Sequence, residues 1–145
     1  MTFLSIIKSA TVAGLLITSA APGIADSNKI RIHQYGDGLA IGGSQSGQWN
    51  RLTVTQRGFA NTSIATQDGR RNRTVVTQGG RRNDVFTTQT GRCNILGVAQ
   101  SGRRNQASVD QSGKCNALAV IQTGRGNNTR TVQRGTGNVA VIVQD

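Results

Sequence analysis

The segment QTGRCNILGVAQSGRRN, residues 89 to 105, contains the pattern Gln-x-Gly-x-x-Asn twice. The first copy spans residues 89–94 and the second spans residues 100–105, so the pattern returns after eleven residues. A short fixed period is typical of repeat architectures, in which each unit buries its apolar face against its neighbours. The repeat therefore decides the architecture of this chain.

The same pattern continues in both directions. Glutamine recurs every eleven residues with no slip in register, and glycine follows two places later from Gly36 to Gly135. Asparagine precedes glutamine by six places in every unit except one, where Leu39 replaces it. The glutamines are Gln34, Gln45, Gln56, Gln67, Gln78, Gln89, Gln100, Gln111, Gln122, Gln133 and Gln144. The asparagines are Asn28, Asn50, Asn61, Asn72, Asn83, Asn94, Asn105, Asn116, Asn127 and Asn138.

Between asparagine and glutamine, the side chains alternate in character. Leu52 and Val54 share one parity, for example, and Thr53 and Thr55 share the other. A period of two predicts a strand with one buried side. Pairs expected on the buried side include Ile30 and Ile32, Leu96 and Val98, Leu118 and Val120, and Ala140 and Ile142. The segment Gln-x-Gly-x-x-Asn is then a turn, with glycine where positive φ or close backbone approach is needed.

The pattern predicts eleven strands, which begin at residue 28 and then every eleven residues to residue 138. Two units make one rung, so we expect an all-β, amyloid-like solenoid of 22-residue strand-turn-strand rungs with two stacked parallel sheets. An antiparallel hairpin meander is the alternative, but strict identity at one period favours stacking of each residue over its own copy. Stacked glutamines and asparagines could then form hydrogen-bonded ladders, as in cross-β assemblies. Five and a half rungs would stand about 26 Å tall.

The first 25 residues differ from the rest. Lys8 is their only charge, residues 11–21 are apolar or small, and small residues precede Asp26. We predict a signal peptide at residues 1–25 and a repeat domain at residues 26–145. A membrane anchor would need roughly 20 consecutive apolar residues, and Lys8 and Pro22 bracket a shorter run. Without Lys8 the formal charge falls from +11 to +10, so the basic character belongs to the repeats.

The repeated Gln-x-Gly-x-x-Asn pattern, followed by alternating small apolar residues and another glutamine, resembles the curlin repeat of bacterial curli fibres. The resemblance covers residues 28–144. It implies a secreted subunit of surface amyloid in biofilm and adhesion, with other curlin subunits and an outer-membrane secretion pore with its accessory factors as partners. The family has a major subunit and a minor one that nucleates it. Only residues 26–29 precede the strand pattern where the major type has a Gly-rich segment, and arginine is abundant. Both departures favour the minor, nucleator-like type.

Both ends of the predicted solenoid lack an evident cap, so the chain is expected to polymerise end to end, because unpaired edge strands act as templates. In the predicted arrangement the outward residues of the last strand are Val139, Val141 and Val143. An apolar exposed edge is a predicted association site. We therefore interpret this strand as the assembly edge, and sideways packing against a partner subunit is the alternative.

Basic residues recur at the turns with a spacing of 22. One edge is expected to carry Arg81, Arg82, Arg103, Arg104 and Arg125, and the other Arg70, Arg92 and Lys114. Stacked like charges repel, so a function that benefits from them is worth considering. The hypotheses are gatekeepers against early assembly, contacts to polyanions such as lipopolysaccharide or extracellular DNA, and solvated turns. No motif indicates sequence-specific recognition of nucleic acid.

The two cysteines also lie 22 residues apart. Cys93 and Cys115 each precede the turn asparagine, so stacking would bring their Cα atoms to about 4.8 Å, within the range of a disulfide. Because an exported protein meets oxidising conditions, we predict a Cys93–Cys115 bond. The alternatives are reduced thiols, or a bond that forms only after assembly.

Other function classes fit less well. One histidine and six acidic residues offer no catalytic constellation, so we expect no enzyme, and we predict no metal site and no cofactor. An ice-binding surface would need regular outward threonine rows, and these are interrupted. The main competing hypothesis is a soluble β-solenoid module that binds extracellular polyanions or polysaccharide.

Overall fold

The computed structural model of the chain describes residues 16–17 and 27–145. The predicted signal peptide lies outside the described residues except for the short strand β1 (Leu16–Ile17). Eleven longer strands follow. They are β2 (Lys29–Asp37), β3 (Ala40–Gln48), β4 (Arg51–Phe59), β5 (Thr62–Arg70), β6 (Arg73–Arg81), β7 (Asp84–Arg92), β8 (Ile95–Arg103), β9 (Gln106–Lys114), β10 (Ala117–Arg125), β11 (Asn128–Thr136) and β12 (Val139–Gln144).

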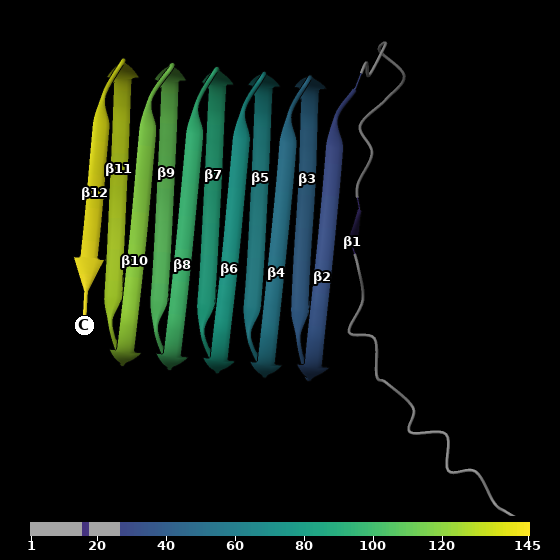
Figure 1. Ribbon diagram of the computed structural model, residues 1–145. Coiled ribbons are helices and arrows are strands. Elements are labelled where there is room, and N and C mark those ends of the chain that lie inside the picture. The colour runs from purple at the N-terminus through teal and green to yellow at the C-terminus, as the bar shows by residue number, and fades with distance from the viewer. Residues whose placement is uncertain (1–15, 18–26) are drawn as a thin grey trace, which may run out of the picture.

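The strands form two parallel sheets that face each other across one core (Figure 1). One sheet has the order β2-β4-β6-β8-β10-β12, and the other has the order β1-β3-β5-β7-β9-β11. From β2 to β12, every strand pairs with the strand two places later, and each residue meets its copy 22 positions on, as Gln78 meets Gln100. The predicted solenoid of 22-residue rungs is therefore confirmed. No helix in the described ranges is long and apolar enough to cross a membrane.

The turns are shorter than the sequence suggested. Strands continue through the Gln-x-Gly-x part of the pattern, and only two residues, such as Arg71 and Asn72, connect one strand to the next. The residue before asparagine takes the left-handed conformation, with φ of 57° at Arg71 and 63° at Cys93. The glycine two residues earlier also has a positive φ, for example 113° at Gly69, but it stays inside the strand, so the backbone ladder persists where a six-residue turn was expected.

Gly58 shows why this place in the rung requires glycine. Its φ is 121°, and a Cβ added there would lie 2.0 Å from the carbonyl oxygen of Gly80 in the next rung. A side chain would therefore be excluded both by the backbone conformation and by the backbone of its own copy. The strict glycine spacing follows from the close stacking of rungs.

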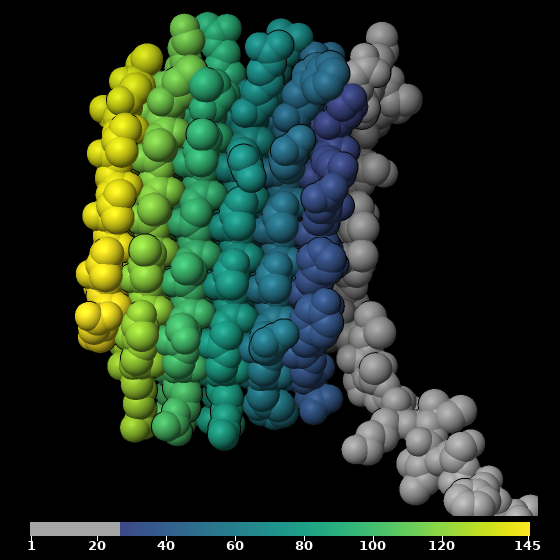
Figure 2. All heavy atoms as spheres, viewed as in Figure 1, coloured from purple at the N-terminus to yellow at the C-terminus, as the bar shows by residue number. Residues whose placement is uncertain are grey.

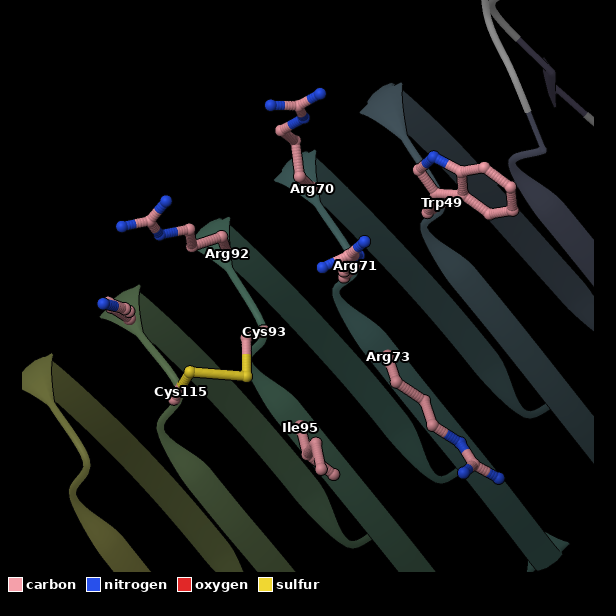
Figure 3. Close-up of a pocket in the computed structure, with 9 residues that line it drawn as sticks. Trp49, Arg70, Arg71, Arg73, Arg92, Cys93, Ile95 and Cys115 are labelled. Carbon is pink, nitrogen blue, oxygen red and sulfur yellow. A yellow bond between two sulfur atoms is a disulfide. The ribbon is translucent and has the colours of Figure 1, made fainter.

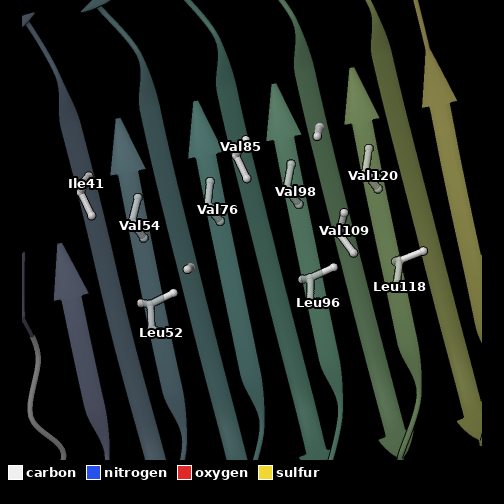
Figure 4. Packing of buried hydrophobic residues seen from close by; sticks show 12 residues of the cluster. Ile41, Leu52, Val54, Val76, Val85, Leu96, Val98, Val109, Leu118 and Val120 are labelled. Atoms are coloured by element: carbon white, nitrogen blue, oxygen red, sulfur yellow. The ribbon is translucent and has the colours of Figure 1, made fainter. Parts of the chain in front are cut away.

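The core is a double row of aliphatic side chains between the sheets (Figure 4). Leu96 and Leu118 are 0% and 3% exposed, as the alternation predicted. Ile30 and Ala140, in the first and last strands of their sheet, are only partly buried. Figure 2 shows the rungs as adjacent columns that run from β2 to β12. The end rungs thus carry the same pattern as the middle rungs but have a neighbour on one side only.

Candidate functional site

The most distinctive feature of the interior is an unbroken ladder of glutamine side chains in each sheet. Gln56 Nε2 donates to Gln78 Oε1 at 2.7 Å, and Gln78 Nε2 donates to Gln100 Oε1 at 3.0 Å. The direction is the same at every step: the Nε2 of the earlier glutamine always donates to the Oε1 of the later one. One ladder joins Gln34, Gln56, Gln78, Gln100, Gln122 and Gln144, and the other joins Gln45, Gln67, Gln89, Gln111 and Gln133.

From Gln45 onward, each glutamine also bonds to a backbone carbonyl oxygen of the opposite sheet. Gln78 Nε2 lies 2.9 Å from the carbonyl oxygen of Thr62 and 2.9 Å from that of Asn83. The Gln78 side chain is 1% exposed, so these partners replace water completely. A buried amide left without partners would cost about 1–3 kcal/mol. The ladder therefore provides hydrogen-bond partners for the buried glutamine amides and for the backbone carbonyl oxygens beside the apolar core.

The asparagines form a second kind of ladder, which joins side chains to backbone. Asn72 Oδ1 accepts the backbone N–H of Asn94 at 3.1 Å. Asn94 Nδ2 in turn donates to the carbonyl oxygens of Thr90 at 3.0 Å and Gly113 at 3.1 Å. Two asparagine side chains also bond to each other directly, from Asn116 Nδ2 to Asn94 Oδ1 at 3.3 Å. The amide can hold the left-handed turn of its own rung and the glycine of the next rung together.

Two threonines extend the glutamine ladders, and sequence reasoning did not single them out. Thr74 Oγ1 accepts from Gln67 Nε2 at 3.0 Å and donates to Gln89 Oε1 at 3.1 Å. Thr129 makes the corresponding bonds to Gln122 and Gln144. The available signal was a threonine at an inward position that is aliphatic in most other units, with Ser63 as the other polar residue there.

One side of the solenoid, which we call the arginine edge, consists of the turns that follow β4, β6, β8 and β10. Its basic residues are Arg81, Arg82, Arg103, Arg104 and Arg125, and together with Phe59 they line a small groove of about 190 Å³. Arg81 pairs with Arg103 in the sheet, and Arg103 pairs with Arg125. No acidic side chain lines this groove. The one salt bridge among the described residues lies elsewhere, between the exposed side chains of Arg134 and Asp110 at 3.9 Å.

The opposite turns form the disulfide edge (Figure 3). Here Cys93 and Cys115 are bonded to each other across adjacent rungs, with a Cα–Cα distance of 4.5 Å. A groove of about 600 Å³ runs past the disulfide. Its lining also includes Trp49, Arg70, Arg71, Arg73, Arg92, Ile95 and Lys114. Both edges are therefore basic, but only this one combines the charge with an indole and an aliphatic side chain.

The strand β12 presents an apolar outer face. Val139 is 78% exposed, Val141 is 66% exposed and Val143 is 61% exposed. At the other end of the same sheet, the outward residues Lys29, Arg31 and His33 are polar and exposed. The two ends of the solenoid therefore differ in chemical character.

The fold is thus a parallel β-solenoid in which buried amide ladders run the full height of the stack. Residues 47–80 and 94–124 match the curlin-associated repeat. The chain is therefore similar to curlin proteins over these two segments, and the match supports a curli-type structural subunit. No curated protein and no solved structure gives a significant match. The repeat and the solenoid together indicate a structural rather than an enzymatic protein.

Proposed function

We propose that this chain is a secreted structural subunit of curli-like amyloid fibres, exported from the cell and assembled at its surface. The observation that carries the proposal is the in-register ladder of buried glutamines, which has the same repeat as a cross-β fibre. The match to the curlin-associated repeat supports the same conclusion. The signal peptide, the passage through an outer-membrane pore with accessory factors, and the location on the cell surface are parts of this proposal.

Within that function, we favour the minor, nucleating role. The arginine-rich turns and the apolar outer face of β12 give this chain two unlike surfaces. The charged turns are stable in water, whereas the apolar face is stabilised by burial against a partner. A subunit that starts a fibre needs a template end, and an apolar edge strand can serve as one. The partners expected in this role are a second curlin subunit and the fibre that grows from it.

The test is fibre formation by the purified chain, followed with thioflavin T and electron microscopy. The fibre proposal expects filaments with a fibre diffraction spacing of about 4.8 Å along the axis. Addition of a small seed to a major curlin from the same organism should shorten that protein's lag. Filaments without this effect would leave a fibre subunit that does not nucleate, and a stable monomer in both experiments would contradict the fibre proposal.

A second candidate is a module that binds extracellular polyanions, and the two basic grooves favour it. Neither groove has an acidic residue in its lining. Phosphate or sulfate groups along a polyanion could contact successive rungs, with affinity that falls steeply with salt. Binding of a single-stranded homopolymeric oligonucleotide, measured between 50 and 300 mM salt, tests this. Replacement of Arg103 and Arg104 by glutamine should lower the slope of log affinity against log salt. An unchanged slope would exclude the arginine edge as the polyanion-binding site.

A further inference from the structure

The described solenoid contains eleven strands from β2 to β12, and this odd number limits how copies can stack. From β2 to β12, strand n pairs with strand n+2 in every case. At the C-terminal end β11 and β12 each have a free edge in the described chain, and at the N-terminal end β2 and β3 are the first full strands. In one chain β2 and β12 belong to the same sheet, while β3 and β11 belong to the other.

We propose that a second copy of this chain stacks on the C-terminal end with its β2 on β11 and its β3 on β12. This inference rests on the proposed fibre function and deepens it. The arrangement turns each copy by about half a turn around the solenoid axis relative to the previous one. We call it the rotated seam. The unrotated alternative places β2 on β12 and leaves an empty strand position between β11 of one copy and β3 of the next.

The ends of the glutamine ladders support the rotated seam. Gln45 Oε1 is buried and has no hydrogen-bond partner among the described residues. In each ladder the earlier glutamine donates through Nε2 to Oε1 of the later one, so Gln45 Oε1 is the atom that would accept from a preceding glutamine. The rotated seam brings Gln144 over Gln45 and Gln133 over Gln34, so both ladders continue with the donor order seen inside the chain. The unrotated stack provides an Nε2 donor from Gln144 to Gln34 only, and it leaves Gln45 Oε1 without a donor.

The outer faces also match better in the rotated seam. It places Val139, Val141 and Val143 of β12 beside the uncharged outward residues of β3, whereas the unrotated stack places them beside Lys29, Arg31 and His33. Arg134 of β11 would lie beside Tyr35, which already has Arg57 at 5.7 Å from its ring centroid on its other side. The unfavourable neighbour is Arg130 beside Arg31. The chain tolerates such a pair where Arg51 meets Arg73.

The edge of β3 is able to accept a parallel strand, because β1 occupies it in this structure. Leu16 pairs with Gly42 and Ile17 pairs with Gly43. In the rotated seam, Val141 and Ile142 of the neighbouring copy pair with the same two glycines. The segment that contains β1 and a second copy therefore compete for one edge, and removal of residues 1–25 would free it.

The turn residues offer a direct test by disulfide formation. Cys93 and Cys115 show that left-handed turn positions of adjacent rungs, with φ of 63° and 53°, can be bonded. Gly38, Gly137 and Ser27 hold the corresponding conformation at the ends, with φ of 63°, 70° and 73°. The rotated seam brings Gly137 next to Gly38 of the following copy, and the unrotated stack brings it next to Ser27. A Cβ would have no contact below 3.6 Å at either glycine.

The experiment uses the chain from Asp26, which contains all strands from β2 to β12, in a Cys93→Ser/Cys115→Ser background. The pair Gly38→Cys and Gly137→Cys is compared with the pair Ser27→Cys and Gly137→Cys, and Gly137→Cys alone serves as the control. After assembly and mild oxidation, non-reducing gels should show a ladder of covalent multimers for the first pair, at least tenfold stronger than for the second. A stronger ladder from the second pair would overturn the proposal, as would covalent dimers of the single variant, which would indicate end-to-end contact of two C-terminal ends.

A second measurement uses fibres of the unsubstituted chain. The rotated seam predicts a two-fold screw with an axial step of about 26 Å per copy in electron cryomicroscopy, because five and a half rungs repeat at about 4.8 Å. The unrotated stack predicts about 29 Å without a screw, and that result would overturn the proposal while leaving the fibre function intact. Absence of fibres would instead contradict the fibre function itself.

Discussion

The middle rungs and the end rungs of this solenoid have the same ladder glutamines at the same positions, yet these side chains meet different partners. In the middle, Gln78 accepts from the rung before and donates to the rung after, and it is 1% exposed. At the N-terminal end, Gln45 donates to Gln67 but its own oxygen has no partner among the described residues. The difference shows that the side chains of each rung depend on the rungs on both sides for their hydrogen-bond partners. An end rung has a neighbour on one side only and so lacks part of these partners.

The largest expected effect comes from adding a side-chain carbon where the backbones of two middle rungs approach each other most closely. In Gly80→Ala the new Cβ would lie 2.0 Å from the carbonyl oxygen of Gly102, on a backbone with φ of 105°. We expect a loss of about 4 kcal/mol or failure to fold, because backbone atoms cannot move aside cheaply. Urea unfolding followed by circular dichroism measures this. Gly79→Ala is the matched control, since its Cβ would meet only Gln100 O at 3.9 Å, and a similar loss there would contradict the explanation.

The same substitution at an end should separate folding from assembly. A Cβ at Gly135 would meet only the Asn138 side chain, at 3.0 Å, so Gly135→Ala carries the strain of φ 117° but no backbone collision. We expect a cost of about 1–3 kcal/mol in the monomer. In the rotated seam, however, Gly135 faces Gly36 of the next copy, so fibre elongation should be lost. Thioflavin T kinetics of the folded variant test this, and unimpaired elongation would contradict a backbone contact at Gly135.

The disulfide should stabilise the middle without acting on the ends. It closes a loop of 22 residues between two central rungs, for which chain entropy predicts about 3 kcal/mol. The double variant Cys93→Ser/Cys115→Ser should therefore unfold at lower urea concentration, while the elongation rate per fibre end changes little. Mass spectrometry of peptides under non-reducing conditions checks the bond. An exclusively intermolecular link would contradict the stacking of these two turns within one chain.

Loss of one ladder amide in the middle should cost less than the Gly80→Ala collision or the loss of the disulfide. Gln78→Leu leaves Gln56 Nε2 and Gln100 Oε1 without their ladder partner, in a site closed to water. We expect destabilisation of about 2 kcal/mol. Gln106→Leu is the control on an exposed position, and it should change the free energy of unfolding by less than about 0.5 kcal/mol. Equal effects of the two substitutions would mean that the ladder contributes no more than a surface amide.

Much of this architecture could be predicted from the sequence, because one period governs both the backbone and the side chains. The glutamine register and the parity of Leu96 and Val98 were sufficient for the two sheets and their strand order. The two-residue turns were not predicted, since nothing in the pattern shows that a glycine with positive φ can remain in the ladder. The bonds of Thr74 were missed for a similar reason, because a lone inward threonine has no fixed hydrogen-bond partner until both sheets are placed.

The smallest expected effect concerns the arginine edge, and its sign should be opposite to that of the other changes. Arg103 stacks between Arg81 and Arg125, so Arg103→Gln removes repulsion and should raise stability by a few tenths of a kcal/mol at low salt. The gain should vanish at 1 M salt, where the Debye length is about 3 Å. Arg134→Gln is the matched control, because it loses the exposed pair with Asp110 and should lower stability slightly at low salt. Urea unfolding at both salt concentrations distinguishes them. A loss at Arg103 that is independent of salt would mean that its aliphatic stem contributes more through packing than its charge costs, and repulsion along the edge would then be too weak to act as a gatekeeper.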